Sequence, residues 1–155
     1  STTPRLDLDL ACCSWAYGNG QLYLSSNHVD EVRALNLSTG EWEMLPPLPT
    51  QQRGGTPCVV DGRLFLIGGG SGSAFVAEYM VLERRWESVS DMPRAACEVA
   101  AVALDGKLLA IGGGRTEFRP YGVVHHTLAE VFEYVLGSRS WKQLPSLLTC
   151  RYGCG

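Results

Sequence analysis

A pattern of glycines and tryptophans repeats along the chain, and this repetition limits the possible folds more than any other feature of the 155 residues. Trp42, Trp86 and Trp141 follow one another at intervals of 44 and 55 residues. Gly62 and Gly106 each stand twenty residues after one of the first two tryptophans, behind an aspartate, and a run of three glycines begins six residues later. Because several markers share one spacing, the chain is expected to consist of repeated supersecondary units.

Two tyrosines recur at a constant distance from the tryptophans. Tyr79 and Tyr134 each stand seven residues before one of the last two tryptophans. A weaker copy of the pattern opens the chain. There, Asn19-Gly20 matches the Asp-Gly pairs, but Ser26-Asn27 replaces the double glycine and Leu35 replaces the tyrosine. The first repeat is therefore degenerate, and its loops are expected to differ from those of the other two.

Each repeat predicts four short β-strands. The Asp-Gly and Asn-Gly pairs supply the positive φ of a two-residue hairpin turn between the first two strands. No segment has sustained helical periodicity, so the chain is predicted to be all-β. The expected strands are residues 11–17, 56–60 and 98–104 (first), 64–67 and 108–111 (second), 31–35, 75–79 and 130–134 (third), and the segments that begin near each tryptophan (fourth).

Taken together, these motifs resemble the Kelch repeat over roughly residues 5–152, with repeats at about 5–50, 51–94 and 95–150 of a single domain, 1–155. The resemblance implies a Kelch-type β-propeller fold of three four-stranded antiparallel blades, half or a fragment of a six-bladed propeller. Three blades leave two open sheet faces. Two explanations remain open: a head-to-tail homodimer that closes six blades, or the rest of a larger propeller.

Composition excludes several classes of function. The net charge is −3, so there is no cationic excess for general nucleic-acid binding. No apolar run reaches the roughly 18 residues of a membrane span, and no basic segment leads into an apolar one at the start of the chain, so neither a membrane anchor nor a signal peptide is expected. The six cysteines are expected to be reduced thiols of a cytoplasmic protein; they are Cys12, Cys13, Cys58, Cys97, Cys150 and Cys154.

Catalytic and cofactor motifs are weak in this sequence. The adjacent His125 and His126 point in different directions on an extended chain, so they are expected to lie in a solvated loop and not to share a metal. The glycine runs lack the lysine and the helix of a phosphate-binding loop, and no nucleophile elbow is present. We therefore predict no catalytic residue, no metal and no cofactor. The alternative is a small-molecule enzyme with its site at the central opening of the propeller.

The resemblance implies that partners bind where two sets of loops open on one face. One set follows the double glycines (residues 27–30, 70–74 and 115–127), and the other joins successive blades (51–53, 94–95 and 150–152). The predicted function is non-catalytic protein–protein recognition, as a substrate receptor or scaffold, in which arginines bind acidic or backbone groups of a protein or peptide. The candidate residues are Asn27, His28, Arg53, Ser71, Ser73, Arg94, Arg115, Phe118, Arg119, Tyr121 and Arg151.

The third repeat is eleven residues longer than the second, and the excess falls at residues 115–122. Long loops in compact domains are often functional. This one contains Arg115, Phe118, Arg119 and Tyr121, which are residue types enriched at binding hot spots. The alternative for the same segment is a solvated, variable insertion.

Overall fold

The computed structural model describes residues 13–26, 29–51, 53–70 and 72–152. They form three four-stranded antiparallel sheets, each a meander, so the predicted all-β chain of three four-stranded blades is confirmed. The first blade holds β1 (Cys13–Gly18), β2 (Gln21–Ser26), β3 (Val32–Asn36) and β4 (Trp42–Met44). The second holds β5 (Thr56–Val60), β6 (Arg63–Ile67), β7 (Val76–Met80) and β8 (Arg85–Ser88). The third holds β9 (Ala100–Leu104), β10 (Lys107–Ile111), β13 (Val131–Val135) and β14 (Ser140–Leu144).

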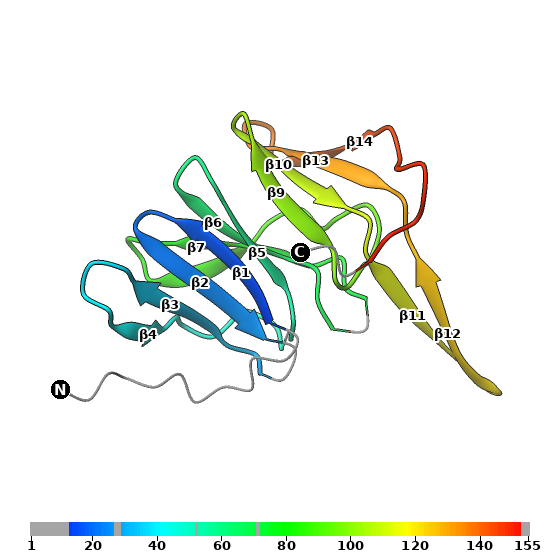
Figure 1. The fold of residues 1–155 in the computed structure, drawn as a ribbon, viewed down its shortest axis with the longest axis horizontal. Coiled ribbons are helices and arrows are strands. Elements are labelled where there is room, and N and C mark those ends of the chain that lie inside the picture. Colours follow the sequence, from blue (N-terminus) through cyan, green and yellow to red (C-terminus); the bar gives the residue numbers. More distant parts are fainter. Residues whose placement is uncertain (1–12, 27–28, 52, 71, 153–155) are drawn as a thin grey trace.

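The blades lie side by side, as Figure 1 shows, with their first strands next to one another. Strand β5 contacts both β1 and β9. One buried cluster joins the first two blades and includes Tyr23, Leu64 and Trp86. A second cluster joins the second and third blades and includes Phe65 and Tyr134. The apolar core therefore lies between the sheets, as it must when each sheet is hydrophobic on the face that it turns to a neighbour.

Alternate residues of the first strands face opposite neighbours. Val59 of the second blade approaches Gly18 of the first, whereas Val60 lies in the cluster shared with the third blade. The same alternation directs part of the first and third blades away from the rest of the structure. The apolar side chains exposed there are Trp15 and Tyr17 on β1 and Val102 and Leu104 on β9.

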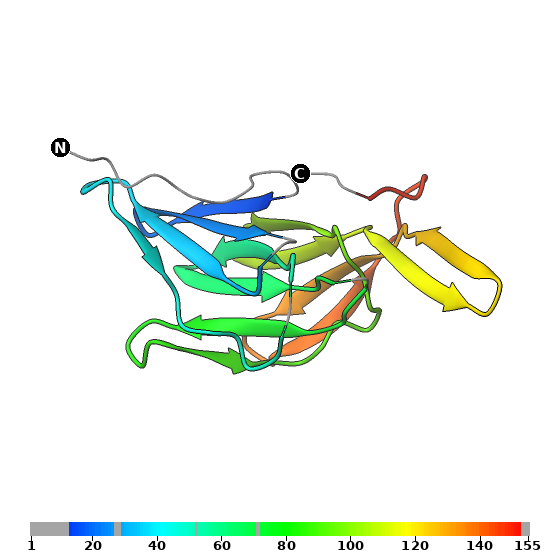
Figure 2. The same ribbon diagram turned by 90° about the horizontal axis from the view of Figure 1, so that it is seen from below.

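Residues 114–127, where the third repeat is longer than the second, form a β-hairpin, so the loop predicted at residues 115–127 is wrong. Strand β11 (Gly114–Arg119) pairs with β12 (Gly122–Thr127) around a two-residue turn at Pro120 and Tyr121. The hairpin projects from the third blade in both views (Figures 1 and 2). Its residues include threonines, valines and a phenylalanine, which favour extended strands. Within the described residues, no helix has the length and apolarity that a membrane crossing requires.

Candidate functional site

The loops that follow the second strands lie against the connections between blades. The Gly70 amide donates to the Arg53 carbonyl over 2.6 Å, and the Gly113 amide donates to the Arg151 carbonyl over 2.8 Å. Ser73 and Ala96 form a backbone bridge of the same kind. These contacts bring both sets of loops to one end of the blades, and we call the described part of that end, residues 29–30, 53–54, 72–74, 94–98 and 150–152 together with Gly70, the loop face.

Two glycines are required for this arrangement. A Cβ atom added to Gly68 would lie 2.5 Å from the Ala96 carbonyl oxygen, and one added to Gly112 would lie 2.5 Å from the Arg151 carbonyl oxygen. Both residues also have positive φ, 65° and 62°, which disfavours any side chain. The double glycines therefore serve the close approach of two backbone segments.

Most arginines of the candidate set are paired with carboxylates of this same chain. Arg53 contacts Asp30 at 3.0 Å, Arg94 contacts Glu130 at 3.0 Å, and Arg119 contacts Glu117 at 3.1 Å. Such partly exposed pairs contribute about 1 kcal/mol or less each, so a partner's carboxylate could displace them. Asp30 and Glu130 thus neutralise Arg53 and Arg94 at the loop face, and Glu117 neutralises Arg119 on the hairpin.

Other candidate residues have different surroundings. The Nε atom of Arg115 is buried without a hydrogen-bond partner among the described residues, and the side chain lies against Gly72. The Ser73 hydroxyl oxygen accepts the Phe75 amide, which gives it a role in its own turn. Arg151 is exposed on a backbone held by Gly113 and Leu128. Three further candidates, Asn27, His28 and Ser71, lie outside the described residues.

One face of the hairpin is charged. The Glu117 carboxylate accepts from Arg119 Nε at 3.1 Å and is paired with His126 Nε2 at 2.9 Å. Hydrogen bonds from Arg119 and then His126 lower the pKa of Glu117 to about 2. His125 lies on the opposite face, where its Nδ1 contacts the Thr116 hydroxyl at 3.2 Å. The two histidines thus belong to a strand, and the solvated loop predicted for them is wrong.

Next to the turn, this opposite face of the hairpin is apolar and exposed. Phe118 and Val123 are direct cross-strand partners, and 73 % of Phe118 is accessible to solvent. Tyr121, at the turn, is fully exposed. We call these three residues the hairpin tip. Sequence reasoning identified Phe118 and Tyr121 but missed Val123, although the alternation of residues 114–127 could have revealed it.

The described hairpin strands have no strand partner except each other, apart from a bridge at the base between Gly114 and Cys97. Their outer edges therefore present unpaired backbone groups, which is the arrangement that accepts an added strand. Among the described residues, no group of three or more histidine, cysteine, aspartate or glutamate side chains is placed to hold a metal ion.

Comparison with known proteins gives two matches. Residues 95–148, which span most of the third blade and the hairpin, match the family described as the Kelch motif. The chain is also similar to the F-box protein AFR of Arabidopsis thaliana, with 28 % identity over 127 residues that cover 75 % of this chain and 32 % of the relative. The chain therefore spans about a third of that relative's length.

Proposed function

We propose that this chain, because it is a Kelch-repeat protein, recognises another protein and does not catalyse a reaction. The similarity to an F-box protein supports a role as the part of a substrate receptor or scaffold that contacts the partner. Nothing in the geometry of the described residues favours the alternative of a small-molecule enzyme over this one.

The main support for this proposal is the exposed hairpin tip. Exposed aromatic side chains on a projecting element are typical of residues that become buried when a partner binds. Phe118 and Val123 offer one continuous apolar surface, and Tyr121 extends it with a hydroxyl that remains able to hydrogen-bond. The unpaired edges of β11 and β12 add backbone donors and acceptors for an extended peptide.

The candidate arginines have a secondary role in this proposal. Arg53 and Arg94 are held by Asp30 and Glu130, so an acidic partner must replace existing ion pairs and gains little net energy from each. Arg115 and Arg151, for which the described residues offer no carboxylate partner, are the better cations for acidic groups. We expect the charges to influence the association rate more than the affinity.

Affinity purification from cell extract tests this function. The intact chain is compared with the double variant Phe118→Ser/Tyr121→Ser, and with the control Val81→Ser/Leu82→Ser, which removes exposed apolar residues from the β7–β8 turn. Proteins recovered with the intact chain and the control, but lost with the hairpin variant, support the proposal. Recovery of the same proteins with the hairpin variant contradicts it. Circular dichroism melting of all three chains shows that the substitutions leave the blades folded.

We also propose a cytoplasmic location. Cys58, Cys97 and Cys150 are free thiols, which supports a reducing compartment. Alkylation of freshly unfolded protein without reductant should modify all six cysteines, and two or more native disulfides would contradict the location.

Finally, we propose that two copies associate head to tail to close six blades. The outward faces of the first and third blades expose Trp15, Tyr17, Val102 and Leu104, which a neighbouring blade would cover. Such an arrangement has two identical junctions and closes on itself. A stable monomeric mass in light scattering during size exclusion would overturn it.

A further inference from the structure

The last two blades each reach back to the preceding blade with a tryptophan. Trp86 packs on Tyr79 with ring centroids 5.2 Å apart and donates its indole N–H to the Pro46 carbonyl over 3.0 Å. Trp141 likewise packs on Tyr134 and donates to the Ser90 carbonyl over 2.8 Å. In both cases the accepting carbonyl lies four residues after the tryptophan position of the preceding blade.

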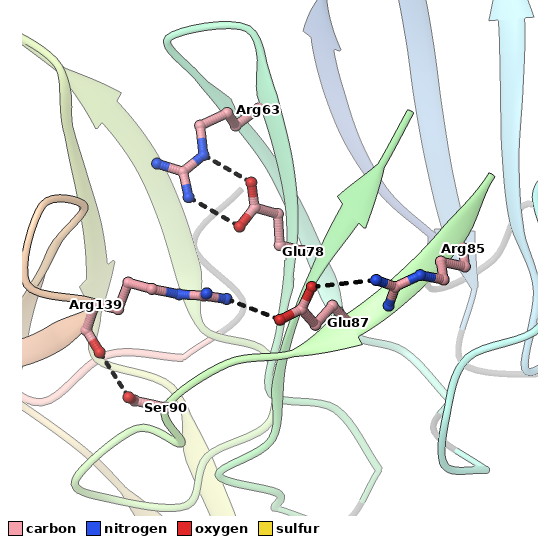
Figure 3. Close-up of polar contacts among 6 residues, drawn as sticks. All are labelled: Arg63, Glu78, Arg85, Glu87, Ser90 and Arg139. Carbon is pink, nitrogen blue, oxygen red and sulfur yellow. Dashed lines mark hydrogen bonds and ion pairs between the residues drawn. The ribbon is translucent and has the colours of Figure 1, made fainter. Parts of the chain in front are cut away.

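An ion pair accompanies each of these contacts. Arg84, two residues before Trp86, lies 3.5 Å from Glu43 of the first blade. Arg139, two residues before Trp141, lies 3.4 Å from Glu87 of the second blade, as Figure 3 shows. The acidic residue directly follows the tryptophan position of the preceding blade in both cases. A junction between blades thus combines one indole hydrogen bond with one ion pair.

The first blade has the tryptophan of such a junction, but no described residue accepts its indole hydrogen bond. Trp42 lines an open cavity of about 380 Å³ together with Glu41 and Glu43, and its indole N–H has no hydrogen bond to a described residue. Gln21, Asn36 and Thr39 complete the wall, so the cavity is polar. Gly40 stands where the other two blades have their arginine, and because Glu43 is already paired with Arg84, Glu41 is the carboxylate of the wall that has no ion pair with a described residue.

The third blade has the complementary half. Lys142 stands directly after Trp141, where the two preceding blades have Glu43 and Glu87. The position that supplies the accepting carbonyl is Pro145, and both Lys142 and Pro145 are exposed. The end that would dock on another blade therefore carries Lys142, which forms no ion pair with a described residue although Glu133 is its cross-strand partner, and the cavity around Trp42 carries the unpaired Glu41.

We infer that the cavity around Trp42 receives the fourth-strand end of the third blade from a second copy of this chain. Lys142 of the second copy pairs with Glu41, and the Pro145 carbonyl of the second copy accepts the Trp42 indole N–H. The reverse junction forms at the same time, which closes the ring. This assignment rests on the proposed head-to-tail dimer and names the contacts that hold it together.

Sedimentation equilibrium of the full chain tests the assignment by charge reversal. Lys142→Glu and Glu41→Lys should each weaken dimerisation about tenfold, because each replaces an attraction by a repulsion at both junctions. The double variant Glu41→Lys/Lys142→Glu restores opposite charges and should recover the original dissociation constant within about twofold. Glu83→Lys, an exposed reversal in the β7–β8 turn, is the matched control and should leave it unchanged.

Two results would overturn the inference, and they differ in what else they affect. A dimer that forms but tolerates both single reversals, or is not recovered by the double variant, removes these contacts and leaves the dimer proposal standing. A monomer at every concentration would contradict both the proposed contacts and the proposed dimer. That result is expected if the cavity receives a further blade of a longer chain.

Discussion

The indole N–H of Trp141 donates to the Ser90 carbonyl over 2.8 Å, and this bond ties the third blade to the second. Trp86 makes the equivalent bond to Pro46 one blade earlier. Each tryptophan thus stabilises two blades at once, by packing within its own sheet and by hydrogen bonding to the preceding one. Junctions of this type hold neighbouring blades together.

Substitution of the buried Trp86 by phenylalanine should lower the free energy of unfolding by about 2 kcal/mol. The ring packing on Tyr79 is largely retained, but the partly buried Pro46 carbonyl loses its donor. Urea denaturation measures the change. Leu82→Ala, at an exposed position in the β7–β8 turn, is the control and should change the free energy by less than about 0.5 kcal/mol. Equal effects of the two substitutions would contradict the structural role of the indole bond.

Gly112→Ala should destabilise the chain by about 3 kcal/mol. The new methyl group would meet the Arg151 carbonyl at 2.5 Å, in a backbone conformation with a φ of 62°. Gly40→Ala separates the steric clash from the unfavourable φ, since Gly40 has a φ of 74° but open space around it. We expect only about 1 kcal/mol for that control. Thermal unfolding of both variants gives the comparison, and similar losses would mean that the close approach is unimportant.

Two arginine–glutamate pairs in Figure 3 should contribute differently to the free energy of unfolding. Arg63 donates through two nitrogens to the buried Glu78, at 2.7 and 2.8 Å. Arg63→Ala should therefore cost about 3 kcal/mol, because it leaves a buried carboxylate without its partner. Arg139→Ala should cost less than about 1 kcal/mol, since Arg139 and Glu87 are both substantially exposed. Denaturant unfolding of the two variants measures the loss in free energy of unfolding. A larger loss for Arg139→Ala than for Arg63→Ala would contradict the expected order.

The charged face of the hairpin should respond to acid. The pKa of Glu117 is about 2 in the folded chain, below its ordinary value of 4.5, so the carboxylate stabilises the hairpin above about pH 4.5 and this contribution is lost as the pH falls toward 2. A carboxyl-carbon NMR titration should place the Glu117 midpoint near 2. In Arg119→Gln the midpoint should move up toward 4.5, because the largest cause of the shift is removed. An unchanged midpoint would show that Arg119 does not hold the carboxylate.

Native-state alkylation should distinguish the cysteines. Burial raises the pKa of Cys58 to about 11, so only about one thiol in a thousand is ionised at pH 8. Cys150 is exposed. Mass spectrometry after brief iodoacetamide treatment at pH 8 should find Cys150 modified at least about tenfold faster than Cys58. Comparable rates would indicate that the second blade opens readily.

Much of the fold was predictable because the responsible interactions are local. The Asp61-Gly62 and Asp105-Gly106 pairs specify two-residue turns, and the expected strands around them agree with β5, β6, β9 and β10 to within two residues. The hairpin was missed although its alternation is equally local. Its two strands pair only with each other, and the segment was interpreted from its length as a long loop, which obscured Val123 as a member of the hairpin tip.

The sequence by itself determined the repeat, its four-stranded unit and the residues that build each turn, because turn chemistry and side-chain alternation act over a few residues. Only the tertiary structure decided which charges meet. Asp30 and Arg53 are 23 residues apart in the chain, and Glu130 lies 36 residues beyond Arg94, yet both pairs close to 3.0 Å. Ion pairing depends on distances between atoms that separate blades bring together, so the identity of the free and the neutralised arginines follows from packing and not from spacing along the chain.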